Sequence, residues 1–230
     1  MIKNPIIAFF FLLISNTICS QGEANNWFFG YGAGLVFDNV NNTVTPTAAA
    51  QNTISTFEGC SSISDPNGNL KFYTDGRDVW DANHVLMPNA DYYSGSGLLG
   101  DPSSTSSAVI IPKPGDVDKY YVFTVDEPHH QNAWAYPNQG PADFDGNPTF
   151  DGSYDSSDPI PGGDDGFNNG LNYSLVDMTL NNGMGDVSVT EKNIQLLTYD
   201  QNNPEHLEYK CAEKITAIEH ADGQSYWVLT

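Results

Sequence analysis

The sequence is poor in basic residues. Of its 230 residues, 8 are Lys or Arg and 29 are Asp or Glu, which gives a formal net charge of −21 at pH 7. Nucleic-acid binding relies on Lys and Arg to neutralise phosphates, so this composition excludes nucleic acid as a partner. An anionic membrane surface is disfavoured for the same reason, whereas divalent cations are compatible partners. The acidity also favours solubility outside the cell, which requires no specific ligand.

Cysteine is scarce as well. Cys19 lies in the first twenty residues, and lipid attachment there would need a small residue before it, where this sequence has Ile18. The other two, Cys60 and Cys211, can pair in an oxidising compartment or stay separate, because spacing does not say whether their Cα atoms meet. The sequence therefore offers one candidate disulfide, between Cys60 and Cys211, and it has no CxxC motif that would bind zinc.

Long apolar runs are confined to the N-terminus. Residues 1–20 contain one Lys, an apolar run from Pro5 to Ile14, and then small and polar residues. That order is typical of a secretory signal peptide, and the run is too short to persist as a membrane anchor. We expect export by the Sec route, cleavage before Gln21, no membrane insertion afterwards, and a location in the medium or on the outer cell surface.

Helical periodicity is missing throughout, and short apolar runs alternate with clusters of Gly, Asn, Asp, Ser and Pro. This pattern predicts an all-β protein with many short strands. Segments 61–76, 107–126 and 214–230 each contain an Ile-, Val- or Ala-rich strand, a turn, and a strand rich in aromatic residues. Asn-Gly and Asp-Gly pairs supply two of these turns, and they are strong hairpin signals.

Recurrence of the hairpins predicts a β-propeller. A four-stranded unit that repeats every 40–50 residues is typical of blades of the WD40 or YVTN kind. About three blades are recognisable, so residues 21–230 are expected to form a partial propeller that continues beyond Thr230. The aromatic residues of the second strands are expected to pack between blades, as is Trp80 on a third strand; they are Phe72, Tyr73, Tyr121, Phe123, Tyr226 and Trp227.

An acidic insert, residues 126–170, interrupts the second hairpin unit between its second and third strands. It contains no Lys or Arg, and loops of this length are either functional or disordered. Ca²⁺ prefers six to eight oxygen ligands from closely spaced Asp and Asn. The insert offers such ligands without the full spacing of an EF-hand, at Asp143, Asp145, Asn147 and Asp151.

Aromatic residues in the same insert suggest a second use. Trp134, Tyr136 and Tyr154 can stack on a sugar ring or pack against the propeller. No GxSxG, HExxH or phosphate-binding loop is present, so these hydrolase and nucleotide motifs give no support to an enzyme. Paired carboxylates for glycoside hydrolysis stay open, because the chain has many Asp residues to choose from.

Six segments, taken together and in order, resemble a known kind of protein. They are residues 25–37, 58–89, 97–115, 120–126, 171–187 and 213–230, which include "NNWFFGYGAGLVF", "SDPNGNLKFYTDGRDVWD" and "EKITAIEHADGQSYWVLT". They resemble the N-terminal propeller-like region of large secreted proteins of Bacteroidota. Those proteins commonly continue into PKD-type or other immunoglobulin-like modules. They often end in the gliding-motility-associated C-terminal domain that directs type IX secretion.

The resemblance implies contact with the secretion machinery, a place on the cell surface or in the medium, and a binding or adhesive role without a catalytic set. Three functions therefore stay in view. The first is a non-catalytic binding or adhesion module for a surface polysaccharide or protein. The second is a polysaccharide-active hydrolase or carbohydrate-binding propeller. The third is a structural module stabilised by Ca²⁺.

Overall fold

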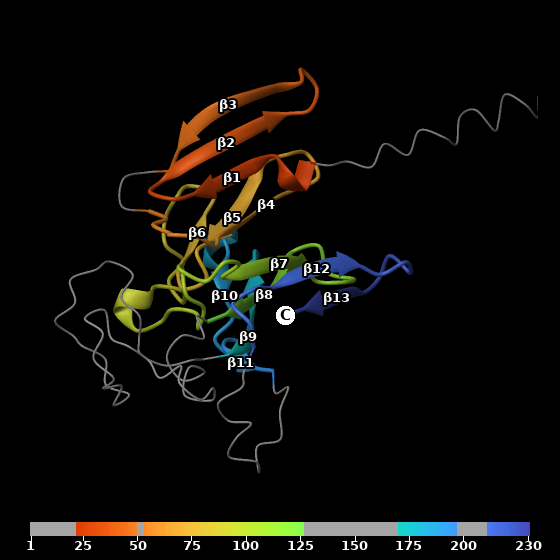
Figure 1. The fold of residues 1–230 in the computed structure, drawn as a ribbon. Helices are drawn as coiled ribbons and strands as arrows, with labels where there is room; N and C mark the ends of the chain where they lie inside the picture. Colours follow the sequence, from red (N-terminus) through yellow and green to blue (C-terminus); the bar gives the residue numbers. More distant parts are fainter. Residues whose placement is uncertain (1–21, 50–52, 127–169, 197–210) are drawn as a thin grey trace, which may run out of the picture.

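The fold consists of four small antiparallel β-sheets that follow one another along the chain (Figure 1). The structure is a computed structural model, and it describes residues 22–49, 53–126, 170–196 and 211–230. In these residues no α-helix is present, and the helical turns are short 3-10 segments. The all-β prediction is confirmed. None of the four sheets closes on itself, and a propeller is not established by this arrangement.

The strands fall into four sheets in chain order. The first sheet contains β1 (Asn26–Phe29), β2 (Ala33–Asp38) and β3 (Thr43–Ala48). The second contains β4 (Ser61–Ser64), β5 (Leu70–Thr74) and β6 (Val79–Asp81). The third contains β7 (Ala108–Pro112), β8 (Lys119–Val125), β9 (Leu171–Asp177) and β10 (Asp186–Val187), with β11 (Ile194–Gln195) paired to β9. The fourth is the hairpin of β12 (Thr216–Glu219) and β13 (Tyr226–Leu229).

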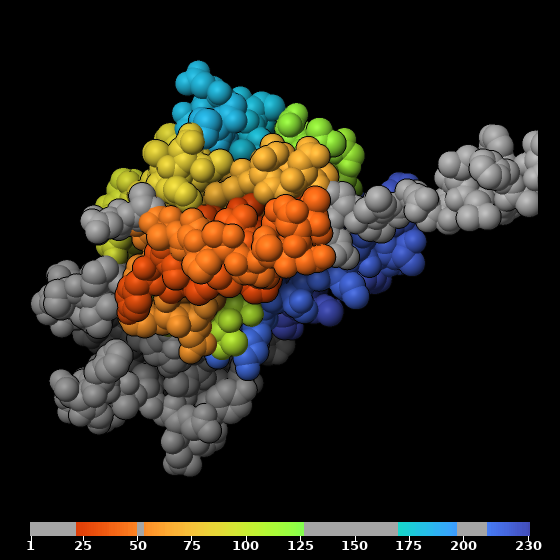
Figure 2. Space-filling view, turned by 90° about the horizontal axis from the view of Figure 1, so that it is seen from above, coloured from red at the N-terminus to blue at the C-terminus, as the bar shows by residue number. Residues whose placement is uncertain are grey.

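All three hairpins expected from the sequence are present, as β4–β5, β7–β8 and β12–β13. Their turns use the chemistry that the sequence indicated. In the β4–β5 turn, the Asp65 carboxylate accepts hydrogen bonds from the backbone N–H groups of Asn67 and Asn69, and Gly68 has a φ of +86°. In the β12–β13 turn, the Asp222 carboxylate likewise accepts hydrogen bonds from two backbone N–H groups. The first sheet, which sequence analysis did not treat as a unit, lies in front of the others when the molecule is seen from above (Figure 2).

The first strands of the second, third and fourth sheets lie side by side and begin at one end of the molecule. β4 contacts β7, and β7 contacts β12. Gly59 before β4 lies against Ser107 before β7, and Ser106 donates a backbone hydrogen bond to Glu213 before β12. We call β4, β7 and β12 the inner strands.

β1 does not share this direction, because it runs opposite to β4. The Asn26 side chain at its start donates to Gly68 O beyond the end of β4, and the Phe28 N–H donates to Ser62 Oγ nearer its beginning. The first sheet is therefore joined to the series in a different way from the other three.

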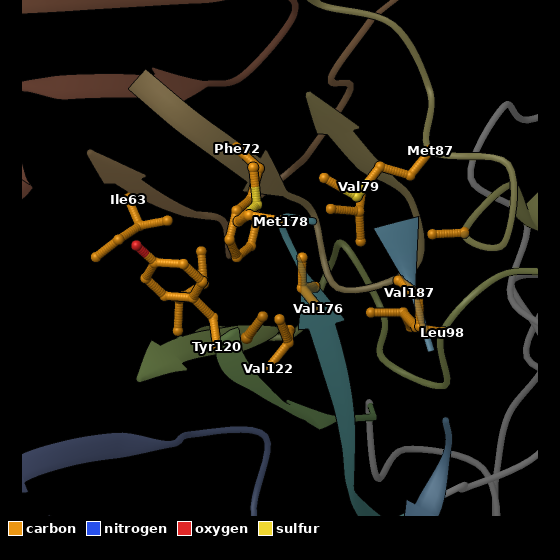
Figure 3. Packing of buried hydrophobic residues seen from close by; sticks show 13 residues of the cluster. Ile63, Phe72, Val79, Met87, Leu98, Tyr120, Val122, Val176, Met178 and Val187 are labelled. Carbon is orange, nitrogen blue, oxygen red and sulfur yellow. The ribbon is translucent and has the colours of Figure 1, made fainter. Parts of the chain in front are cut away.

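Each sheet packs on the next through a cluster of buried apolar side chains. The cluster between the first and second sheets includes Phe28, whose ring stacks on Tyr73 at a centroid distance of 4.7 Å. The cluster between the second and third sheets includes Phe72, which meets the Tyr120 ring edge to face at 5.4 Å (Figure 3). Because successive side chains of a strand point to opposite faces, the neighbours Phe72 and Tyr73 serve two different interfaces.

A third cluster joins the third and fourth sheets. Val125 and Leu171 from the third sheet pack with Ile215, and Val228 of β13 lies against them. Phe123 also packs on this cluster, whereas Tyr121 meets Tyr173 on the same sheet at 5.7 Å. The expectation that every second-strand aromatic packs between sheets is wrong for Trp227, which is 59% exposed on the outer side of β13.

We expect the substitution Phe72→Ala to destabilise the protein by about 3–5 kcal/mol, because it removes a fully buried ring and leaves a cavity between two sheets. The matched control is Phe57→Ala, whose ring is 57% exposed and whose loss should change stability by about 0.5 kcal/mol or less. Urea unfolding followed by tryptophan fluorescence measures both. Equal losses for the two variants would contradict this account of the core.

Candidate functional site at the end where the inner strands begin

Several connections meet at the end where the inner strands begin, which we call the junction end. Phe57 and Glu58, in the loop before β4, donate backbone hydrogen bonds to Pro102 O in the loop before β7. The turn between β5 and β6 joins them, because the Gly100 N–H donates to Gly76 O. Loops that are far apart in the sequence are thereby fixed to one another.

The acidic insert leaves and re-enters the third sheet at the same end, and we call these two points its root. β8 ends at Val125 and β9 begins at Leu171, and these two residues are paired in the sheet. The two ends of the insert therefore lie next to each other at the junction end. Asp101 ties this root to the loop before β7, because its backbone N–H donates to Val125 O.

Two glycines make the close approach at the junction end possible. A Cβ atom on Gly59 would lie 2.2 Å from the backbone N of Ser107, which is closer than real Cβ atoms come. A Cβ atom on Gly76 would lie 2.8 Å from Cβ of Ser107, and Gly76 has a φ of +98° that side-chain-bearing residues rarely adopt. Any larger residue at these positions would push the loops apart.

Among the described residues, five charged side chains are buried at the junction end or beside it. Four of them are acidic and one is basic. They are Asp75, Arg77, Asp78, Asp101 and Asp126.

The Asp75 carboxylate accepts hydrogen bonds from the backbone N–H groups of Arg77 and Asp78, and it thereby holds the β5–β6 turn. The Asp78 carboxylate accepts a 2.6 Å hydrogen bond from the Tyr92 N–H, and the Arg77 guanidinium lies 4.4 Å from the centre of the Tyr92 ring. Both Asp75 and Asp78 are therefore bonded to backbone donors, as structural carboxylates are.

Burial dominates the electrostatics of this group. Burial raises the pKa of Asp75, against the opposing effect of its backbone hydrogen bonds and of Arg77. Burial, and next the charge of Asp75, raise the pKa of Asp78 to about 7. Burial would lower the pKa of Arg77, but the carboxylates of Asp101 and Asp75 outweigh it and raise that pKa. Arg77 is thus a permanent positive charge that compensates the buried acids.

Buried hydroxyl groups complete the junction end. Thr56 Oγ1 lies 2.6 Å from Gly59 O and 2.8 Å from Pro102 O, so it links the loops before β4 and β7. The hydroxyl oxygens of Ser104, Ser107 and Thr124 are buried without a hydrogen-bond partner in the structure. Over the described ranges, no three His, Cys, Asp or Glu side chains come together as a metal ion would require. The arrangement is suited to fixing loops in place.

The site residues expected in the insert lie outside the described residues and stay predictions. They are the Ca²⁺ ligands Asp143, Asp145, Asn147 and Asp151, and the sugar-stacking residues Trp134, Tyr136 and Tyr154.

The signal peptide, residues 1–20, also lies outside the described residues, and it too stays a prediction. In the part of the chain that is described, no helix has the length and apolar character needed to cross a membrane.

The structure does not join Cys60 to Cys211 by a disulfide. Cys60 packs beside the cluster between the first and second sheets, and Cys211 packs beside the cluster between the third and fourth. Burial, with the charge of Asp75 nearby, raises the pKa of the Cys60 thiol, so this thiol is protonated at neutral pH. Pairing of the two in the exported protein stays a prediction, and non-reducing peptide mapping checks it.

Sequence analysis missed the group around Arg77. Asp75 stands in an Asp-Gly pair, and this pair is a turn signal that fits its hydrogen bonds but does not indicate its burial. A signal was present, because Arg77 is the sole arginine in the sequence and it stands between two acids in "DGRD". A single arginine in a chain with so few basic residues is a candidate for a buried structural role.

Comparison with known proteins does not assign a function to this site. No model of a protein family, no curated protein and no solved structure matches the chain. The junction end is therefore interpreted from its own residues.

Asp78 makes stability depend on pH in a defined direction. Its pKa in the folded protein is about 7, against 3.8 ordinarily, so the folded state holds this proton more tightly than the unfolded chain. Its contribution to stability is therefore full below about pH 4 and is lost as the pH rises to about 7. We expect Asp78→Asn, which keeps the acceptor for Tyr92, to raise the free energy of unfolding at pH 8 and to change it little at pH 4.

The control for that experiment is Asp116→Asn. Asp116 is a partly exposed partner of Lys119, whose hydrogen bond lowers the pKa of the Asp116 carboxyl. Its loss should slightly weaken the protein at pH 8, which is the opposite sign. Urea unfolding at several pH values measures both variants, and a pH-independent effect of Asp78→Asn would show that this carboxylate is not held protonated.

Proposed function

We propose that this protein is an exported, non-catalytic binding module of the cell surface or medium, and that its second, third and fourth sheets are successive blades of a β-propeller. The observation that carries the proposal is the common origin of the inner strands. β4, β7 and β12 lie in contact in chain order and begin at the same end. Inner strands of propeller blades share a direction around a common axis.

This geometry supports a ligand site at the junction end. In an up-and-down sheet, the loop that enters the first strand and the loop between the second and third strands lie at the same end. Each blade therefore adds two loops there, and the third sheet adds the whole acidic insert through its paired ends, Val125 and Leu171. Binding residues are concentrated on loops that a rigid scaffold positions, and the buried group around Arg77 supplies that rigidity.

The charge of the protein restricts the ligand. With a net charge of −21, binding to a polyanion would be opposed by repulsion at physiological ionic strength. A neutral surface polysaccharide or a basic protein segment is compatible with it. The aromatic residues Trp134, Tyr136 and Tyr154 of the insert favour the polysaccharide, because aromatic rings bury the apolar faces of sugars.

Binding is preferred to hydrolysis because of the carboxylates at the junction end. A glycoside hydrolase needs two carboxyl groups that can reach one glycosidic bond. Asp75 and Asp78 are buried and bonded to backbone N–H groups, and Asp101 accepts from the N–H and the hydroxyl of Ser103. These groups are committed to the scaffold. Export to the surface, with help from the secretion machinery, follows from residues 1–20 and from the resemblance described above.

The test removes the insert and keeps the scaffold. Because Val125 pairs with Leu171, residues 127–169 can be replaced by a short Asn-Gly turn without breaking the third sheet. We expect the shortened protein to fold, as judged by circular dichroism and thermal unfolding, and to lose binding to isolated cell envelopes. The matched control is Val117→Lys, in the turn at the opposite end of β7 and β8, which should bind as the wild type does.

The envelopes identify the class of ligand when they are treated before the assay. Periodate oxidises sugar rings, so its treatment should abolish binding if the ligand is a polysaccharide, whereas protease treatment should abolish it if the ligand is a protein. Undiminished binding by the shortened protein would contradict a site at the insert. Release of reducing sugar from envelope polysaccharide by the wild type would contradict the non-catalytic assignment.

Calcium is tested in the same assay. If Asp143, Asp145, Asn147 and Asp151 hold Ca²⁺, EDTA should make the insert more sensitive to protease and lower binding, and added Ca²⁺ should restore both. A protease pattern that EDTA leaves unchanged would rule out this predicted site.

A further inference from the structure

Two exposed aromatic rings meet at the junction end, outside the acidic insert. Tyr31 follows β1, and because β1 runs opposite to β4, the turn after β1 lies at the end where β4 begins. Phe57 lies in the loop that leads into β4. The two rings are nearly perpendicular, at 85°, and their centroids are 6.3 Å apart. We call this pair the aromatic corner.

The aromatic corner is open to solvent. The Tyr31 side chain is 77% exposed, which is more than any other aromatic side chain of the described residues, and Phe57 is 57% exposed. Neither ring belongs to the three buried clusters that join the sheets. A single exposed apolar side chain needs no explanation. Here, however, two rings from different loops are brought together and still left open, as they would be at a binding site.

The backbone under the aromatic corner is fixed by hydrogen bonds on both sides of Tyr31. On one side, the Gly32 N–H donates to Ile54 O. On the other side, the Thr56 N–H donates to Gly30 O. The turn after β1 and the loop before β4 are therefore tied together, and a ligand would find the two rings already in position. Such preorganisation lowers the entropy cost of binding.

A hydroxyl group lies on the same side as the two rings. Tyr31 and Ser55 are paired in an antiparallel bridge, and residues paired in this way point to the same side. Along the loop before β4, Ile54 and Thr56 are buried. Their neighbours Ser55 and Phe57 are more accessible, so they point to the outer side. The aromatic corner thus combines two apolar rings with a group that donates and accepts hydrogen bonds.

This combination fits a neutral sugar residue. A sugar ring has an apolar C–H face that packs on aromatic rings, and hydroxyl groups that bond to a few polar side chains. A polyanion would be repelled by the net charge of −21. A basic side chain can also stack on aromatic rings, and Glu58 beside Phe57 would attract it. The group that shares the outer side with both rings is a hydroxyl, however, and this favours the sugar.

We propose that the aromatic corner binds one sugar residue of a neutral glycan, which packs against Tyr31 and Phe57 and bonds to the Ser55 hydroxyl. The inference deepens the function proposed above and rests on it for the partner, a surface polysaccharide. The aromatic corner is also connected to the root of the insert. Phe57 donates to Pro102 O, and the neighbouring Asp101 N–H donates to Val125 O. A glycan that reached both the corner and the insert would gain affinity from two linked contacts.

The experiment uses the mature chain, without residues 1–20, and simple sugars as the probe. Methyl glycosides of neutral hexoses and N-acetylhexosamines are added at millimolar concentration, and NMR measures the saturation transferred from protein to sugar. We expect transfer to at least one glycoside, with weak affinity because a single sugar residue makes few contacts. Tyr31→Ala and Phe57→Ala should each lower that affinity by about fivefold or more.

Two control variants separate loss of the ring from other effects. Tyr31→Phe keeps the ring and should bind as the wild type does. Trp227→Ala removes a ring that is 59% exposed in the fourth sheet, and it should leave binding unchanged. Because Tyr31 and Phe57 are exposed, their alanine variants should unfold at the wild-type temperature.

The proposal would be overturned if no glycoside received saturation, or if the transfer were unchanged in both Tyr31→Ala and Phe57→Ala. It would also be overturned if a Lys- and Arg-rich peptide bound through the two rings while the sugars did not. Failure of the function proposed above gives a different pattern. In that case the protein would not bind envelopes through the insert, yet transfer to simple sugars would still depend on Tyr31.

Discussion

The packing of the molecule depends on two neighbouring residues of β5. Phe72 and Tyr73 are both fully buried, and they point in opposite directions. Phe72 meets Tyr120 of the third sheet, whereas Tyr73 meets Phe28 of the first, with Trp80 stacked beside it at 5.3 Å. β5 is therefore buried on both faces, which is unusual for a short antiparallel strand. The second sheet acts as the layer on which its neighbours are assembled.

The hairpins could be predicted from the sequence because their determinants are local. Asp65, Gly68 and Asp222 form turns through hydrogen bonds and dihedral angles that involve only a few successive residues. The aromatic residues that recur in the second strands were expected to pack between sheets, and Phe72 and Tyr73 of β5 do so. The all-β class follows from these features alone, and so does the place of Phe72 in the core.

Other features could not be predicted because their determinants are distant in the sequence. At the junction end, Gly59 and Gly76 lie close against Ser107, which is possible only because neither glycine has a side chain. No local sequence pattern indicates this contact. The burial of Arg77 depends on loops from two sheets. The first sheet was overlooked because β3 is exposed on both sides and contains Pro46. Its pairing becomes visible only through the register with β2. The residues predicted to bind a ligand lie in the insert, outside the described residues.

Pro46 has a further consequence for the outermost strand. β3 is the edge of the first sheet, and a proline there lacks the N–H group that an added strand would need. The sheet can therefore be covered on its face but is poorly suited to being lengthened sideways, which is the route by which exposed edges template fibrils. Pro46 therefore disfavours aggregation through this edge of the first sheet. Exchanging it for a β-branched residue would be expected to shorten the shelf life of the purified protein before it changed its fold.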